Sequence, residues 1–305
     1  SATKVTAKLL ESATNLKVIG RAGIGVDNVE IPAASKKGVI VMNTPFGNSV
    51  TTAEHAIALM FAVARQLPEA SVSTHAGKWE TNRFMGVEVF NKTLGIIGAG
   101  NIGSIVIDRA LGLRMKVLAY DPFLSEERAV ELGVKKVELD ELLARADFIT
   151  LHVPLTDKTR NILSRDNLAK TKKGVRIVNA ARGGLIDEDA LADLLKSGHV
   201  AGAALDVFAT EPATDSPLFN LPNVVVTPHL GASTNEAQEN VALQVAEQMS
   251  DYLLTGAVQN ALNMPSVTAE EAAVMGPWIK LAGHLGAFIG QMTDEPIKAI
   301  NVLYD

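Results

Sequence analysis

The sequence contains no cysteine among its 305 residues. Disulfide bonds, thiolate nucleophiles and cysteine-based zinc sites are therefore excluded. The chain also lacks an excess of positive charge, since its net charge is −6, so neither nucleic acid nor an anionic membrane surface is an expected partner. We expect no membrane-spanning run and no secretion signal. These absences favour a cytoplasmic protein.

Apolar residues are abundant, at 47 % of the chain, and the length suits about two domains. From residue 93 onward, short apolar strands alternate with helical segments, with strands expected near residues 94, 117, 148, 176, 202 and 224. Such alternation is typical of a doubly wound parallel α/β sheet. Because the alternation begins well inside the chain, we expect a different unit to precede it.

A glycine-rich turn joins the first of these strands to a helix. Gly98, Gly100 and Gly103 form the pattern G-x-G-x-x-G directly after an apolar stretch. The first glycine of this motif makes a tight turn, the second lets the backbone approach a pyrophosphate, and the third lets helix and strand pack closely. Asp121 ends the next strand, where a carboxylate can accept both ribose hydroxyls and repels a 2′-phosphate. The pattern predicts NAD rather than NADP.

Three polar residues follow later strands at the edge of the sheet where ligands of open α/β folds bind. They are Arg182, Glu211 and His229. An arginine can hold a carboxylate in a bidentate fork. A glutamate bonded to a histidine fixes the tautomer of the imidazole and favours its charged form, which makes a general acid/base. Each residue alone has a structural alternative, but their convergence beside a nucleotide fold indicates a catalytic site.

The remaining histidines lack this combination of neighbours. His152 stands at a strand end, but no carboxylate follows it closely. His55 and His75 are assigned to the first domain, His199 to a helix end and His284 to the tail. We interpret all five as structural, and no metal site is predicted.

These motifs resemble the D-isomer-specific 2-hydroxyacid dehydrogenase family. The matching stretches cover nearly the whole chain and comprise residues 20–28, 43–45, 47–49, 95–103, 179–184, 204–208 and 229–234. The resemblance implies a Rossmann domain inserted into a smaller flavodoxin-like substrate domain, in a homodimer or homotetramer. Family members carry further residues before the position of Ser1, so the N-terminal part of the substrate domain is expected to be missing.

The resemblance also divides the chain into four segments. Residues 1–91 form the incomplete substrate-binding domain with a subunit-contact helix and an irregular loop, and residues 92–232 form the NAD-binding domain. Residues 233–260 form a helix that returns to the substrate domain. Residues 261–305 begin a C-terminal extra domain, with a strand-like stretch at 297–303.

By this resemblance Arg182, Glu211 and His229 are the catalytic residues. Cofactor contacts are expected at the glycine-rich turn and the strand ends: Gly98, Gly100, Asn101, Ile102, Gly103, Asp121, Val153, Ala180, Ala181, Asp206, Gly231 and Ala232. Substrate contacts are expected at Arg21, Gly23, Ile24, Asn48 and Arg83. Arg83 is the candidate ligand of a substrate phosphate, with a solvated arginine as its alternative.

The activity implied by the resemblance is NAD-dependent oxidation of 3-phospho-D-glycerate to 3-phosphooxypyruvate, the first step of L-serine biosynthesis. Two alternatives stay open. One is another D-2-hydroxyacid specificity, such as a glyoxylate or hydroxypyruvate reductase. The other is a non-catalytic NAD-sensing protein, like the transcriptional corepressors that resemble this family.

Overall fold

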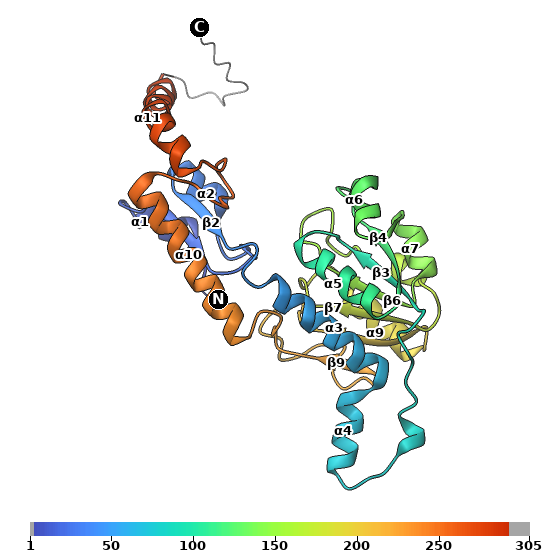
Figure 1. Cartoon of the computed structure of the whole chain (residues 1–305). Helices are drawn as coiled ribbons and strands as arrows, with labels where there is room; N and C mark the ends of the chain where they lie inside the picture. Colours follow the sequence, from blue (N-terminus) through green and yellow to red (C-terminus); the bar gives the residue numbers. More distant parts are fainter. Residues whose placement is uncertain (1–2, 293–305) are drawn as a thin grey trace. The chain divides into compact units, whose positions relative to one another are not determined.

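The chain divides into two compact units in the computed structural model, which describes residues 3–292 (Figure 1). Unit 1 comprises Ser1–Thr44 and Ala242–Asp305, and unit 2 comprises Pro45–Val241. Unit 2 is therefore inserted into the chain of unit 1. The strand-like stretch expected at 297–303 lies outside the described residues.

Unit 2 is built on a parallel sheet of seven strands in the order β5-β4-β3-β6-β7-β8-β9. The strands are β3 Thr93–Ile97, β4 Lys116–Tyr120, β5 Lys135–Lys136, β6 Phe148–Leu151, β7 Val175–Asn179, β8 Val200–Leu205 and β9 Val224–Val226. This is the Rossmann strand order with one further strand beyond β8. The predicted doubly wound sheet is confirmed. The order reverses between β3 and β6, which places the ligand crevice after these two strands.

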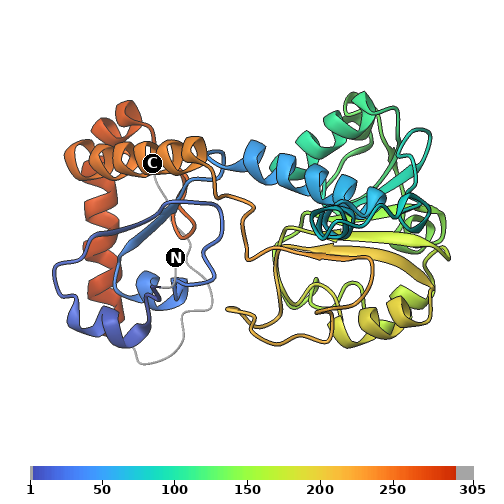
Figure 2. The ribbon, with the colours of Figure 1, turned by 90° about the horizontal axis from the view of Figure 1, so that it is seen from below.

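Helices cover both faces of this sheet, as Figure 2 shows. They are α3 Ser49–Arg65, α5 Asn101–Gly112, α6 Glu126–Glu131, α7 Leu139–Arg145, α8 Arg165–Ala169 and α9 Glu188–Lys196. Between α3 and β3 the chain also forms α4 Leu67–His75 and a 3-10 turn η1 at Thr81–Arg83. Neighbouring strand residues alternate between the two cores, so Ile96 packs with α3 and α5 whereas Ile97 packs with α7 and α9. Both cores consist of buried apolar side chains, which fixes the strand ends in place.

Helix α3 belongs to unit 2, although the sequence analysis places the domain boundary at residue 91. Its buried residues Ala56, Met60 and Val63 join the core of the sheet. A Cβ at Gly202 of β8 would come within 2.7 Å of Val63 Cγ2, so helix and strand are in close contact. This apolar packing explains why unit 2 begins at Pro45.

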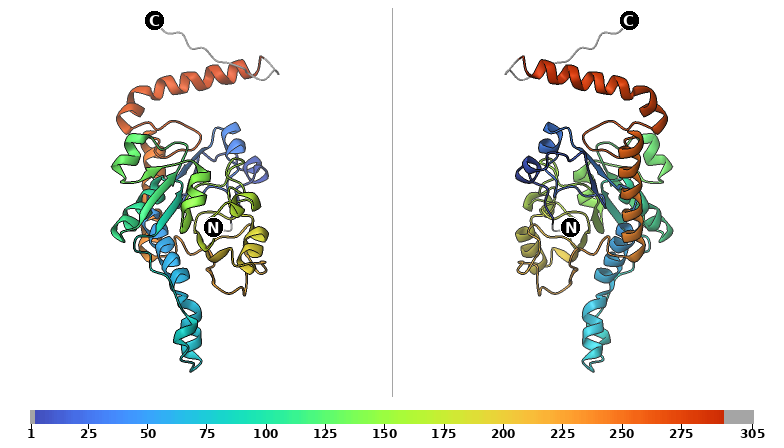
Figure 3. Two further views of the ribbon diagram at one scale, coloured as in Figure 1. Left: turned by 90° about the vertical axis from the view of Figure 1, so that its right-hand side faces the viewer. Right: turned by 90° about the vertical axis from the view of Figure 1, so that its left-hand side faces the viewer.

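The segment after α3, expected to be irregular, contains α4 and η1. Figure 3 shows α4 continuing from α3 away from the sheet of unit 2. Gln66 adopts a left-handed conformation (φ 53°) and ends α3, and α4 follows with a proline in its first turn. Large apolar side chains on this segment are exposed: Leu67, Val72, Trp79, Met85 and Phe90.

Unit 1 holds a two-stranded parallel sheet formed by β1 Val18–Arg21 and β2 Ile40–Asn43. Its helices are α1 Ala7–Ser12, α2 Ile31–Lys36 and α11 Ala269–Gly290, and α10 Asn235–Thr255 begins in unit 2 and ends in unit 1. Val41 packs with α1 and α2, whereas Ile40 and Met42 pack with residues of the returning C-terminal segment. The strands are therefore buried on both faces.

One helix among residues 3–292, α11, is long and apolar enough to cross a membrane by length and composition. The sequence analysis expected no such run. Buried core helices of soluble proteins can also meet this criterion of length and composition. In α11, however, only 6 % of the most apolar window is buried. One such helix, identified by length and composition, is weak evidence for a membrane span.

Candidate active site

The glycine-rich turn after β3 has the geometry that a dinucleotide requires. A Cβ at Gly98 (φ +97°) would lie 2.6 Å from the His152 carbonyl oxygen, and a Cβ at Gly103 would lie 2.1 Å from the Gly98 carbonyl oxygen. The fold itself therefore requires both glycines. A Cβ at Gly100 would meet no atom within 4 Å. Gly100 instead borders open space at the N-terminus of α5, where backbone N–H groups can receive a pyrophosphate.

Asp121 is fixed beside this turn at the end of β4. Its Oδ2 accepts a hydrogen bond from the Ala99 amide at 2.9 Å, and its Oδ1 accepts one from the Phe123 amide at 2.9 Å. The remaining lone pairs of the carboxylate can accept ribose hydroxyls. The acceptor oxygens of Asp121 therefore fit the ribose of NAD.

The other predicted cofactor residues lie at the same end of the sheet. Asn101 and Ile102 open α5, and the Val153 side chain lies against Gly98. Ala180 and Ala181 follow β7 and are buried. Gly231 and Ala232 are the second and third residues after His229. Contacts between these residues and NAD stay predictions.

His229 and Glu211, the predicted acid/base pair, lie in contact with each other. His229 Nδ1 lies 2.7 Å from Glu211 Oε2, and Glu211 Oε1 accepts a hydrogen bond from the Phe208 amide at 3.0 Å. About half of the His229 side chain is exposed. With Nδ1 engaged, Nε2 is the nitrogen left for a substrate.

The backbone turn that carries His229 is supported by Asp206, which is fully buried at the end of β8. His229 adopts a left-handed conformation (φ +57°), and its amide donates to the Asp206 carbonyl oxygen at 2.8 Å. The Asp206 carboxylate accepts hydrogen bonds from the Leu230 and Gly231 amides, each at 2.7 Å. Asp206 is a predicted cofactor contact, and that contact stays a prediction. Its hydrogen bonds to the two amides support the turn.

Arg182 follows β7 on a loop held by its own strand. Asn179 Nδ2 donates to the Arg182 carbonyl oxygen at 2.9 Å, and Arg182 Nη1 donates to the Ala181 carbonyl oxygen at 2.6 Å. A Cβ at Gly183 would lie 1.7 Å from the Phe208 carbonyl oxygen. The loops that carry Arg182 and Glu211 are therefore in direct backbone contact, as the parallel topology predicts.

The predicted substrate loop ends β1 in unit 1. Gly23 (φ +130°) donates its amide to Thr44 Oγ1 at 2.6 Å, and Asn43 Nδ2 donates to the Ile24 carbonyl oxygen at 2.8 Å. The Arg21 guanidinium donates to the Ala22 carbonyl oxygen. The end of β2 thus holds the loop in a defined conformation.

Asn48 and Arg83, the other predicted substrate contacts, belong to unit 2. The Asn48 carbonyl oxygen accepts the Thr52 amide at 3.1 Å where α3 begins. Arg83 lies on η1, where its Nη1 pairs with Glu80 Oε2 at 3.0 Å and its guanidinium stacks on the Phe84 ring at 5.1 Å. Arg83 thus has protein partners on its own segment.

Two histidines interpreted as structural lie beside the site. His55 on α3 approaches the Asp206 carboxylate, with Nε2 3.2 Å from Oδ1. His152 follows β6, where burial lowers its pKa to about 4, and its Nε2 lies 3.0 Å from Thr150 Oγ1. A helix packing across a sheet brings His55 to Asp206, and no local motif signals that contact.

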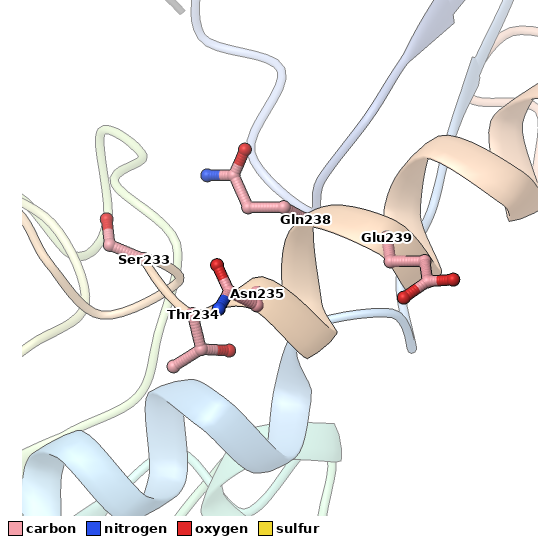
Figure 4. Close-up of a pocket in the computed structure, with 5 residues that line it drawn as sticks. All are labelled: Ser233, Thr234, Asn235, Gln238 and Glu239. Carbon is pink, nitrogen blue, oxygen red and sulfur yellow. The ribbon is translucent and has the colours of Figure 1, made fainter.

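A polar hollow lies just after the His229 turn, at the start of α10 (Figure 4). Its lining residues are Ser233, Thr234, Asn235, Gln238 and Glu239. None of the predicted site residues lines it. The hollow begins at the residue that follows Ala232, a predicted cofactor contact.

Comparison with known families identifies two segments of the chain. Residues 57–231 match the model described as "D-isomer specific 2-hydroxyacid dehydrogenase, NAD binding domain". Residues 274–305 match the model described as "D-3-phosphoglycerate dehydrogenase intervening domain". The first match spans most of unit 2, including the glycine-rich turn and His229.

Several curated proteins named D-3-phosphoglycerate dehydrogenase are similar to this chain. A D-3-phosphoglycerate dehydrogenase of Synechocystis sp. is 49 % identical over 302 residues, which is 99 % of this chain and 54 % of the relative. The chain spans 54 to 58 % of the length of such curated relatives.

Two solved structures are also similar. A glyoxylate reductase from Paecilomyes thermophila has a TM-score of 0.80 at 36 % identity, covering 85 % of this chain and 79 % of that one. A D-lactate dehydrogenase from Aquifex aeolicus, complexed with NAD and lactic acid, has a TM-score of 0.77 at 30 % identity, covering 86 % and 85 %. The chain therefore belongs to the D-isomer specific 2-hydroxyacid dehydrogenase family and contains its NAD binding domain.

Proposed function

We propose that the protein oxidises 3-phospho-D-glycerate at C2 to 3-phosphooxypyruvate with NAD, the first step of L-serine biosynthesis. The observation that carries the proposal is the 2.7 Å contact between His229 and Glu211 at the ligand edge of a Rossmann sheet. A base held in one tautomer there suits removal of a hydroxyl proton. Curated relatives named D-3-phosphoglycerate dehydrogenase support this choice of substrate.

Each residue of the trio has a defined task in this reaction. NAD supplies the hydride acceptor when it is bound. His229 removes the C2 hydroxyl proton through Nε2, and Glu211 stabilises the imidazolium that forms. Arg182 orients the substrate by pairing with its carboxylate. Positioned proton transfer of this kind is typically worth about 10²–10⁴ in rate.

The substrate phosphate and the assembly belong to the same proposal. The segment 67–91 exposes the apolar side chains of Trp79 and Met85, and contiguous exposed apolar surface marks interaction sites. We assign this segment to contact with a second copy of the chain, in a homodimer or homotetramer. Arg83, on the same segment, receives the substrate phosphate, and the reaction takes place in the cytoplasm.

A substrate panel followed by NADH absorbance tests the proposal. 3-Phospho-D-glycerate should give the highest kcat/KM among D-2-hydroxy acids. In the His229→Ala variant, the rate of NADH formation with this substrate should fall close to the rate without enzyme. The similarity to a glyoxylate reductase favours one second candidate, which predicts faster reduction of glyoxylate or hydroxypyruvate. NADH binding without turnover of any acid would refute both reactions and leave the NAD-sensing alternative.

A further inference from the structure

His55 is held at the base of the catalytic turn by two oxygen atoms. Its Nε2 lies 3.2 Å from Asp206 Oδ1 and 3.3 Å from Thr227 Oγ1. The Thr227 hydroxyl itself donates to Asp206 Oδ1 at 2.5 Å, so its oxygen presents only lone pairs to the histidine. Since both neighbours are acceptors, Nε2 must carry a hydrogen and donate it.

The group that receives this hydrogen bond holds the backbone of the turn. Asp206 is fully buried, and its carboxylate accepts the amides of Leu230 and Gly231, the two residues after His229. Burial by itself raises the pKa of Asp206, but hydrogen bonds from His55, Thr227 and the two amides lower it below its ordinary value. The carboxylate therefore stays charged, which strengthens each bond it accepts.

Helix α3 also contacts the turn directly. A Cβ at Gly231 would lie 3.5 Å from Thr52 Cγ2, one helical turn before His55. A loss of the His55 hydrogen bond would leave one acceptor site on a buried carboxylate unsatisfied, which is costly. The carboxylate would then shift or admit water, and the amides of the turn would lose their fixed acceptor.

We propose that His55 is a positioning residue, which orients the Asp206 carboxylate and through it the backbone turn that presents His229. His55 itself does not touch the reacting atoms in this proposal. The link to catalysis rests on the proposed function, but the link to the turn does not.

The test compares substitutions at His55 by amide hydrogen exchange on the whole chain. His55→Leu keeps the volume but removes the donor, so the Leu230 and Gly231 amides should exchange about tenfold faster, as expected for one lost hydrogen bond to a charged group. His55→Gln places an amide donor near the position of Nε2. The exchange rates of the two amides should then stay within about threefold of the parent, clearly below the acceleration expected for the Leu variant. The amides of β3 should be unchanged. His284→Leu, at an exposed position on α11, is the matched control.

A second arm guards against a Leu variant that does not fold. His55→Asn is polar but too short to reach Asp206, so it should behave like the Leu variant rather than the Gln variant. Equal exchange of the turn amides in the parent and the Asn variant, or equal acceleration in Asn and Gln variants, would overturn the proposal.

Turnover separates this proposal from the proposed function. If 3-phospho-D-glycerate is oxidised, kcat should fall about tenfold in the Leu or Asn variant, in step with the faster exchange, and recover in the Gln variant. If no acid is turned over, the proposed function fails while the exchange data still decide the role of His55. Normal turnover and unchanged amide exchange in the Leu and Asn variants would refute the positioning role of His55 and leave the proposed function standing.

Discussion

Gly100→Ala separates the demands of the fold from those of the cofactor. Gly100 has φ −71° and ψ −155°, which alanine also adopts, and the added Cβ would meet no protein atom within 4 Å. Stability should therefore change by no more than about 0.5 kcal/mol. The new methyl group would occupy the space through which a pyrophosphate approaches the α5 amides. Loss of one hydrogen bond to a charged group costs about 1.5–3 kcal/mol, which is about 10- to 100-fold in Kd.

Fluorescence titration with NADH and thermal unfolding measure the two effects side by side. Gly112→Ala is the matched control, because its Cβ also meets nothing within 4 Å but lies at the far end of α5. It should leave NADH affinity unchanged. Gly103→Ala would force a Cβ to 2.1 Å from the Gly98 carbonyl oxygen, so it should lose both stability, by about 1–3 kcal/mol, and binding. Unchanged NADH affinity in Gly100→Ala would refute the assignment of the pyrophosphate to this turn.

Three further predictions concern side chains of unit 2. Asp121→Ala should narrow the preference for NAD over NADP, measured as the ratio of kcat/KM, and an unchanged ratio would remove Asp121 from ribose recognition. His229→Ala should lower kcat by about 10²–10⁴ while NADH still binds, and Glu211→Gln should also lower it; activity within severalfold of the parent would contradict the acid/base assignment. Burial lowers the pKa of His152 from 6.5 to about 4. Between these pH values the unfolded state binds a proton at His152 that the folded state does not, so the free energy of unfolding should fall as the pH drops from 6.5 toward 4. When the free energy of unfolding is measured with urea between these two pH values, it should fall less steeply with decreasing pH in His152→Leu than in the parent. An equally steep fall in both proteins would argue against a buried neutral imidazole.

The sequence predicts the parts of this protein that depend on local pattern. Strand, glycine turn and acidic residue follow each other within one βαβ unit, so the spacing alone predicts a dinucleotide site there. The convergence of Arg182, Glu211 and His229 follows from one rule, because each comes after a strand of the same parallel sheet. The contact of His229 with Glu211 is expected because β8 and β9, which precede them, are parallel neighbours in this sheet.

Other features were missed because their signal is weak or lies outside the local sequence. Strand β5 consists of two lysines and has no apolar pattern to mark it. Helix α4 has little amphipathic character and only one buried residue, Ser73, so its sequence predicts a loop rather than a helix. Its conformation follows instead from the left-handed Gln66 and the proline of its first turn.

The placement of α3 shows why the missed contacts matter for function. Sequence order separates His55 from Asp206 by several strands, and nothing in either neighbourhood predicts their meeting. The contact arises because the apolar face of α3 packs on β7, β8 and β9. This packing brings His55, in the first half of α3, to Asp206 at the end of β8. A buried carboxylate at such an end must find donors, and α3 supplies one of them. The helix that completes the core thereby also completes the support of the catalytic turn, so packing and chemistry are determined by the same interface.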